Sequence, residues 1–306
     1  MTTLDTLARQ YHAYVSSDGA GFRRQTRVLQ SMWREERGYP IGLHRGQPLG
    51  SRLPMPWARE TLNNYLTDTV RAVVRREVLD PSRSAGKLYA RPRIFNDLLS
   101  SQPLCFNLFA QLQQDLELAS AVFHTLTAGR IARVTSIEFE YSPGRGDPHY
   151  TSDQSAFDVS VTYNTPAGKS GFAGIEVKYH ENLQGAPARH RPRYDEVANV
   201  MGCFDDESLS LLQRQPLQQI WRDHLLAGAH LHVDNFDDGF FAFLYPRENT
   251  HCAAAIQRYR ACLSDDHTFT AWTLEGFLNA ARQHTRSSWP GLVFDRYFNF
   301  EKLEQV

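Results

Sequence analysis

Long apolar runs are absent from this 306-residue sequence, although hydrophobic residues make up 42% of it. No stretch approaches the roughly 18 consecutive apolar residues that indicate a transmembrane helix. The opening residues, MTTLDTLARQYHAY, mix polar and apolar side chains and contain no basic segment followed by an apolar one. We therefore expect a soluble protein with no membrane partner, no secretory signal and a cytoplasmic location.

Cysteine is also scarce, and its spacing excludes two classes of small protein. The four cysteines, at positions 105, 203, 252 and 262, are far apart and form no CxxC pair. This spacing argues against a zinc knuckle and against a disulfide framework. We expect buried, reduced thiols.

Lysine is the scarcest charged residue, because only four of the 33 basic residues are lysines. The formal net charge is −1, but residues 21–93 contain 15 basic residues and 6 acidic ones. Arginine is abundant throughout the chain, so the clustering is more informative than the arginine content. An excess of nine positive charges in one region favours contact with a polyanion.

Hydrophobic periodicity predicts helices in the first part of the chain and strands in the middle. Helices are expected at residues 3–14, 21–36 and 57–78, with a Gly- and Pro-rich loop before the third, and a long amphipathic helix at 104–126. Alternating segments at residues 133–141, 156–163 and 172–179 predict strands. A helix at 208–227, a strand at 240–245 and helical segments at 252–298 follow. The order predicts an α/β fold, a mixed sheet flanked by helices.

Two of the predicted strands carry acidic side chains among apolar neighbours. Alternation places Asp158 on one face with Ser160 and Thr162, and Phe157 on the other with Val159, Val161 and Tyr163. Glu176 and Lys178 likewise share a face. A hairpin symmetric about Ala167 would pair residues whose numbers add to 334, and would place Asp158 opposite Glu176. A shift of one residue would separate them.

Two carboxylates and an ammonium group at one point suggest metal-dependent phosphate chemistry. Mg²⁺ and Mn²⁺ prefer oxygen ligands and retain waters, and such an ion polarises a phosphate and lowers the pKa of a bound water. Lys178 stands where this chain would normally use Arg, which suggests that a compact ammonium is required. The alternative is an ordinary cross-strand ion pair facing solvent. The apolar surroundings, AFDVSV and GIEVKY, favour the functional interpretation.

Asp158 followed by Glu176-Val177-Lys178, after a long helix and a first strand, resembles the PD-(D/E)XK nuclease superfamily. The stretches SSQPLCFNLF, FEYSPGRGDP, SAFDVSV, GIEVKYHE and LQQIWRDHLLA resemble an uncharacterised bacterial branch of it, over residues 100–227. The resemblance implies a restriction-endonuclease-like core in which Asp158 and Glu176 bind metal and Lys178 assists the nucleophile. Phe157 stands where the motif has proline.

The resemblance also implies supporting residues, for which solvated side chains are the alternative. Many members have a further acid near the sheet, for which Glu140 is favoured over Asp115, Glu117 and Glu138. For substrate binding we expect Gln218 and Arg222, four apart on one helix, with Arg191 and Arg193 in the basic loop ARHRPRY. Glu181 is a further candidate to complete the site, but a solvated position at the end of the strand is favoured for it.

A competing motif, His230-x-His232-x-Asp234, is similar to half of a zinc-hydrolase ligand set. The histidine expected next is Asn235, and no downstream ligands are evident. The zinc hydrolase is therefore the less favoured alternative.

Together these patterns predict a basic helical extension at residues 1–103 and a nuclease-like domain at 104–306. The predicted function is Mg²⁺- or Mn²⁺-dependent hydrolysis of phosphodiester bonds, in DNA rather than RNA by analogy with the family. A catalytically inactive nucleic-acid-binding module of the same fold is the alternative. A homodimer is compatible with the sequence.

Overall fold

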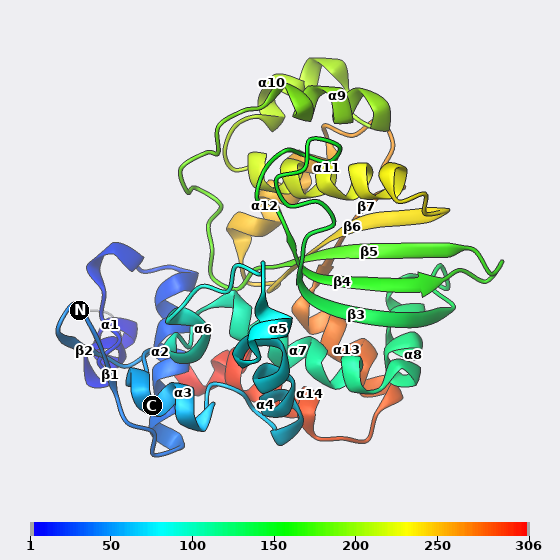
Figure 1. Cartoon of the computed structure of the whole chain (residues 1–306). Coiled ribbons are helices and arrows are strands. Elements are labelled where there is room, and N and C mark those ends of the chain that lie inside the picture. Colours follow the sequence, from blue (N-terminus) through cyan, green and yellow to red (C-terminus); the bar gives the residue numbers. More distant parts are fainter. Residues whose placement is uncertain (1–2, 305–306) are drawn as a thin grey trace. The chain divides into compact units, whose positions relative to one another are not determined.

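The computed structural model in Figure 1 describes residues 3–304. Two compact units can be distinguished: one combines Met1–Gln111 with Arg286–Val306, and the other is Leu112–Thr285. The sequence predicts a single boundary at residues 103 and 104, whereas by its contacts the C-terminal segment groups with the first hundred residues. The assignment of functions to the two predicted domains stays a prediction.

The first unit is largely helical, as predicted. Residues 57–78 do not form one helix, because Leu62 ends α3 with a left-handed backbone (φ 54°) and Thr67 caps α4 by accepting the Val70 N–H. The predicted loop includes a short antiparallel hairpin, β1–β2. The elements are α1 (Thr3–Gln10), η1 (Ser16–Asp18), α2 (Phe22–Glu36), β1 (Gly42–His44), β2 (Gln47–Leu49), α3 (Met55–Thr61), α4 (Asp68–Val74), η2 (Arg75–Leu79), α5 (Pro81–Ser84), α6 (Arg93–Asn96), α14 (Trp289–Tyr297) and η4 (Phe300–Leu303), and α7 (Ser101–Gln114) crosses the boundary.

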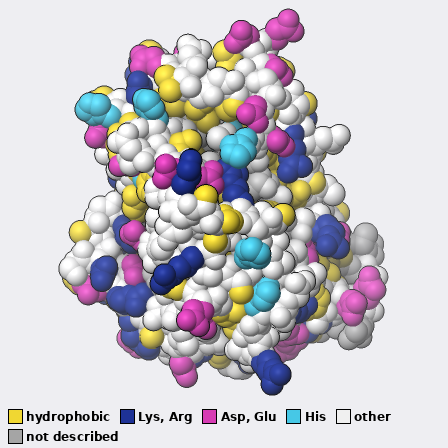
Figure 2. Space-filling model, turned by 90° about the vertical axis from the view of Figure 1, so that its right-hand side faces the viewer, with side chains coloured by type: hydrophobic (Ala, Val, Ile, Leu, Met, Phe, Trp, Pro, Cys, Tyr) yellow, Lys and Arg dark blue, Asp and Glu magenta, His cyan; other side chains and the backbone are white. Residues whose placement is uncertain are grey.

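Many arginines of the basic region are used to hold the first unit together. Asp5, Asp18 and Asp97 lie outside residues 21–93, and each is paired with an arginine from within them. Arg27, for example, is buried and donates from Nε to Asp18 at 2.5 Å. On the face drawn in Figure 2, acidic, basic and histidine side chains are interspersed. The charge count alone therefore overstates the positive surface that is free to meet a polyanion.

The second unit contains a five-stranded mixed sheet in the order β3-β4-β5-β6-β7. Strands β3 (Arg133–Tyr141), β4 (Phe157–Asn164) and β5 (Ser170–Val177) are antiparallel, while β6 (Asp238–Tyr245) and β7 (Phe269–Thr273) run parallel to β5. Figure 1 shows α8 (Leu116–Leu126) and α13 (Leu274–His284) on one side of the sheet. On the other side are α9 (Pro192–Met201), η3 (Asp206–Ser208), α10 (Leu209–Leu212), α11 (Gln218–Val233) and α12 (Thr250–Arg260). The predicted fold class is confirmed.

The predicted hairpin register is confirmed as well. Val159 pairs with Ile175, Val161 with Ala173 and Tyr163 with Gly171, so the paired numbers add to 334. This ladder, together with the parallel pairing of β5 to β6, places the end of β5 inside the sheet rather than at its edge. The residues at that end are therefore enclosed by neighbouring strands.

Three further predictions about individual elements are wrong. The long helix breaks at Asp115, whose Oδ1 accepts the Leu118 N–H at 2.9 Å and caps a separate helix, α8. The helix expected at residues 208–227 is divided into α10, which covers Leu209–Leu212, and α11, which begins at Gln218, because Pro216 between them cannot donate to a helical ladder. Strand β7 lies in a region predicted to be helical; its five residues are too few for alternation to be distinctive.

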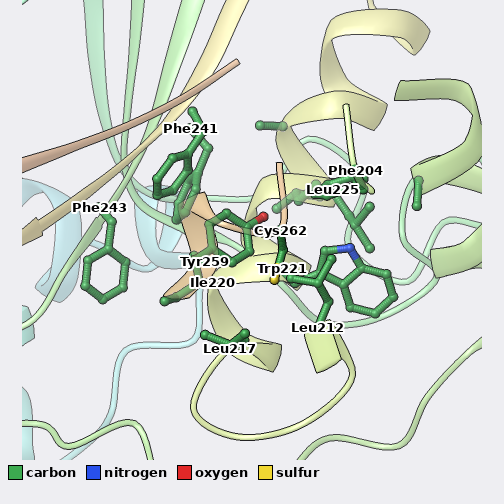
Figure 3. Close-up of a cluster of buried hydrophobic side chains, with 14 of the residues drawn as sticks. Phe204, Leu212, Leu217, Ile220, Trp221, Leu225, Phe241, Phe243, Tyr259 and Cys262 are labelled. Atoms are coloured by element: carbon green, nitrogen blue, oxygen red, sulfur yellow. The ribbon is translucent and has the colours of Figure 1, made fainter. Parts of the chain in front are cut away.

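The apolar face of α11 forms a core with the sheet. Trp221 and Leu225 of α11, Phe241 and Phe243 of β6 and Tyr259 of α12 belong to one cluster of buried side chains, part of which is drawn in Figure 3. All four cysteines are buried free thiols, as predicted. None of the helices within residues 3–304 has the length and apolarity needed to cross a membrane.

Candidate metal centre and catalytic site

The regular antiparallel pairing of β4 with β5 stops at Val159, so Asp158, the preceding residue in the chain, lies just outside it. Val159–Ile175 is the last regular pair, and beyond it the Asp158 carboxylate accepts the backbone N–H of Val177 through Oδ2 at 2.8 Å. A side-chain oxygen thus takes the place of a strand carbonyl. Asp158 is thereby fixed beside the segment that carries Glu176 and Lys178.

The predicted orientation of Phe157, which precedes Asp158, is wrong. Its ring does not lie on the face of Val161 and Tyr163. It joins the core beneath α11, with its centroid 6.4 Å from that of Phe172. The ring covers Gly174 so closely that a Cβ added there would lie 2.5 Å from Phe157 Cε1. Strict alternation fails because Phe157 lies beyond the last regular pair with β5, although it still pairs with Tyr141 of β3.

Glu176 and Lys178 lie on the same side of β5 and are in direct contact, as their spacing predicts. Both are 7% exposed, and Lys178 Nζ donates to Glu176 Oε1 at 2.5 Å. Gln219 of α11 donates to the same oxygen from Nε2 at 2.8 Å. Two donors from different elements therefore fix the orientation of the Glu176 carboxylate.

The electrostatics of Asp158 and Lys178 indicate one strongly coupled site. Burial raises the pKa of Asp158 well above its usual range, and the nearby charge of Glu176 raises it further. Burial alone would lower the pKa of Lys178, but Glu176, Glu181 and Asp158 outweigh that effect and raise it. Lys178 is therefore a charged ammonium group among carboxylates at neutral pH.

The described structure thus brings an aspartate, a glutamate and a lysine together at the end of two central strands. The predicted pairing of Asp158 directly opposite Glu176 is not formed, because the ladder stops at Val159–Ile175. A family model for the PD-(D/E)XK nuclease superfamily matches residues 16–299. The chain belongs to this superfamily. No curated protein and no solved structure shows significant similarity to it. Membership in a superfamily of nucleases supports metal-dependent cleavage of phosphodiester bonds, with a nucleic acid as substrate.

The donor set of this PD-(D/E)XK site suits a hard divalent cation. Asp158 and Glu176 offer carboxylate oxygens, which Mg²⁺ and Mn²⁺ prefer. Within residues 3–304 no cluster of three or more acidic, histidine or cysteine side chains is placed to hold a metal ion. The direct protein ligands suggested by the geometry are therefore two, and the remaining positions would be left to water and phosphate.

Glu140, the favoured third acid, lies next to Asp158 on β3. The pairs Phe139–Val159 and Tyr141–Phe157 flank it, and its backbone has a left-handed φ of 48°. Such a conformation is uncommon for a residue other than glycine and is often found at functional sites. The Glu140 carboxylate accepts a bond from Arg145 at 3.2 Å. Its role as the third acid of the site stays a prediction.

Gln218 and Arg222 both have structural partners. Gln218 holds the backbone of Ala188 with two hydrogen bonds, to its N–H at 2.7 Å and its C=O at 2.8 Å. Arg222 donates to Asp153 at 2.7 Å and to Ser155 at 2.8 Å. Residues 153–155 lead directly into β4, so Arg222 anchors the approach to Asp158.

The other predicted supporting residues lie in three different settings. Arg193 donates to the carbonyls of His149 and Tyr150, at 2.7 and 2.9 Å, whereas Arg191 is exposed. Glu181 accepts the Tyr179 N–H at 2.7 Å and closes the turn after β5. The three remaining third-acid candidates, Asp115, Glu117 and Glu138, are exposed.

Two residues of α11 for which the sequence makes no prediction, Gln219 and Asp223, lie on the side of the helix that contacts Glu176. Gln219 contacts Glu176, and Asp223 is one helical turn further along. Asp223 is 5% exposed, and its Oδ2 has no hydrogen-bond partner. Burial raises the pKa of Asp223 well above its usual range, and the charge of Glu176 is the next largest cause. A spacing of four residues on α11 does identify the pair on the side of Glu176, but this pair is Gln219 and Asp223 rather than the predicted Gln218 and Arg222.

The competing zinc motif lies at the end of α11, where His230 and Asp234 serve the fold and His232 is exposed. His230 Nδ1 is 2.6 Å from Asp234 Oδ2, which also accepts the Tyr150 hydroxyl at 2.7 Å. His230 and Asp234 are four residues apart on the helix and form a local pair. This arrangement gives no support to a zinc hydrolase.

Proposed function

We propose that this PD-(D/E)XK protein is a nuclease that hydrolyses phosphodiester bonds, in DNA by preference, at Asp158, Glu176 and Lys178. Mg²⁺ or Mn²⁺ is the proposed cofactor. The observation that carries the proposal is the convergence of these three groups around Val177. A solvent-facing ion pair would not account for it, since Glu176 and Lys178 are both 7% exposed.

Each residue has a distinct proposed role. A bound divalent cation would polarise the scissile phosphate and lower the pKa of a water molecule. Asp158 and Glu176 would hold the cation, and Gln219 keeps Glu176 in one orientation. Lys178, held as an ammonium, would orient the attacking water and neutralise charge on the phosphoryl oxygens as the 3′ oxygen leaves in line. Glu140, on the adjacent strand, is proposed to raise the pKa of Asp158 through its negative charge.

Substrate contacts are proposed for the basic loop and for the exposed arginines of the first unit. Arg191 is exposed at the start of α9 and is the candidate for a phosphate contact. Gln218, Arg222 and Arg193 have structural partners, so their proposed role is to position the loop and the approach to β4.

The decisive test incubates the protein with circular, linear and single-stranded DNA and with RNA, with and without Mn²⁺. We expect cleavage that requires the metal, that is lost in Asp158→Ala and that persists in Glu117→Gln, which removes an exposed carboxylate. Nucleic-acid binding should survive in Asp158→Ala. Binding without cleavage by the parent protein would instead support the inactive binding module.

A further inference from the structure

Asp223 has an unusual environment for a buried acid. Its side chain is 5% exposed, yet Oδ2 has no hydrogen-bond partner. A buried polar atom without a partner destabilises the folded state, and more so when it is charged. Native structures rarely retain such an atom unless it serves a ligand, an ion or an ordered water.

The position of Asp223 identifies the site that it serves. Gln219, one helical turn earlier on the same face of α11, donates to Glu176 at 2.8 Å. Glu176 is also the charged group with the largest electrostatic effect on Asp223, and Lys178 contributes as well. Asp223 is therefore on the side of α11 that contacts Glu176, while Asp158 approaches from β4.

We infer that Asp223 is a third carboxylate of the divalent-cation site and acts through a water molecule rather than by direct contact. The inference rests on the proposed nuclease function. No three acidic side chains within residues 3–304 are gathered closely enough to hold an ion directly. Mg²⁺ retains several of its waters in proteins, and a water donating to Oδ2 would satisfy the unpartnered oxygen. Asp223 is then a positioning residue.

This role makes opposite predictions for the metal-free and the metal-bound protein. Asp223→Asn keeps the shape of the side chain and removes the charge, so without metal the protein should be as stable as the parent or more so. Partners of metal ligands typically contribute 10–100-fold to metal affinity. The dissociation constant for Mn²⁺ should therefore rise at least about tenfold, and the stabilisation by Mn²⁺ should shrink accordingly.

The experiment measures Mn²⁺ binding by electron paramagnetic resonance and calorimetry, without nucleic acid, alongside unfolding with and without Mn²⁺. The proteins compared are the parent, Asp223→Asn, Asp223→Ala, Asp158→Asn and the exposed-acid control Glu117→Gln. Weakened Mn²⁺ binding in both Asp223 variants, with undiminished metal-free stability in Asp223→Asn, supports the inference. Unchanged Mn²⁺ affinity, or an Asp223→Asn protein that is unfolded or less stable without metal, overturns it.

The same measurements separate this inference from the proposed function. If the parent binds Mn²⁺ and Asp158→Asn does not, while Asp223→Asn binds normally, the nuclease site stands and the role of Asp223 is wrong. If the parent takes up no Mn²⁺, both proposals fail.

Discussion

Asp158 Oδ2 accepts the backbone N–H of Val177 at 2.8 Å, so an acidic side chain continues the pairing of two strands where their regular ladder has ended. Val177 separates Glu176 from Lys178 in the chain, and this one hydrogen bond therefore fixes the aspartate relative to both. The bond makes the same side chain a structural acceptor and a proposed metal ligand.

Asp158→Asn should separate these two roles. The amide oxygen of asparagine can still accept the Val177 N–H, and loss of the charge removes its repulsion with Glu176. We expect a folded protein that is at least as stable as the parent at neutral pH, because the raised pKa of Asp158 shows that its ionised form is disfavoured there. Metal-dependent cleavage should fall by more than about 100-fold, beyond the effect of losing an outer partner. Thermal unfolding and a cleavage assay measure the two effects, and retained cleavage would contradict the assignment.

Lys178→Gln should uncouple metal binding from cleavage. In the parent protein the ammonium of Lys178 donates to Glu176 Oε1 at 2.5 Å and therefore competes with any cation for that oxygen. Without it the site is more negative, so Mn²⁺ affinity should be unchanged or higher while cleavage falls at least about 100-fold, the loss typical of one electrostatic donor. Calorimetry with Mn²⁺ and single-turnover cleavage test the two halves. Parallel loss of binding and cleavage would show that Lys178 instead holds the site together.

Gly174→Ala should destabilise the second unit through Phe157. An added Cβ would lie 2.5 Å from the Phe157 ring, which is 1% exposed and has little room to move. Overpacking of this kind costs about 1–3 kcal/mol. Gly185→Ala is the matched control, since no heavy atom lies within 4 Å of its Cβ. Denaturant unfolding of both variants measures the difference, and equal stability would contradict the packing described for Phe157.

The basic region should divide into arginines that hold the fold and arginines that meet the substrate. Arg59, Arg75 and Arg83 are exposed, whereas Arg27 is buried against Asp18. Replacing the three exposed arginines by Gln should weaken DNA binding with little effect on unfolding, and each lost phosphate contact should reduce the salt slope by about 0.9. Arg27→Gln should lower stability instead. Binding measured at several salt concentrations decides this, and an unchanged slope would show that these arginines do not touch DNA.

Much of the site could be predicted from the sequence because strand pairing has simple rules. Pro166 and Gly168 mark the hairpin, and once its symmetry is chosen the register follows for every pair up to Val159–Ile175. Phe157 could not be placed in this way, because it lies where the regular pairing stops. Asp223 was missed because a helix sequence does not reveal whether a buried acid has a partner; that depends on the elements packed around it.

The charge network in front of β4 gives a prediction about pH. The pKa of Asp153 is about 2: burial alone would raise it, but the Tyr194 hydroxyl and the Arg222 guanidinium outweigh that effect. An acid whose pKa is lowered on folding stabilises the native state above its unfolded pKa, near 3.8, and this stabilisation is lost as the pH falls toward 2. The difference corresponds to about 2 kcal/mol.

Asp153→Asn should lack this part of the acid dependence, and at neutral pH it should be less stable by about 3–5 kcal/mol, because Arg222 loses a buried partner. Denaturant unfolding between pH 7 and pH 2 measures both effects, with the exposed-acid variant Glu117→Gln as the control. If the parent and Asp153→Asn lose stability in parallel on acidification, the ion pair does not anchor the approach to Asp158.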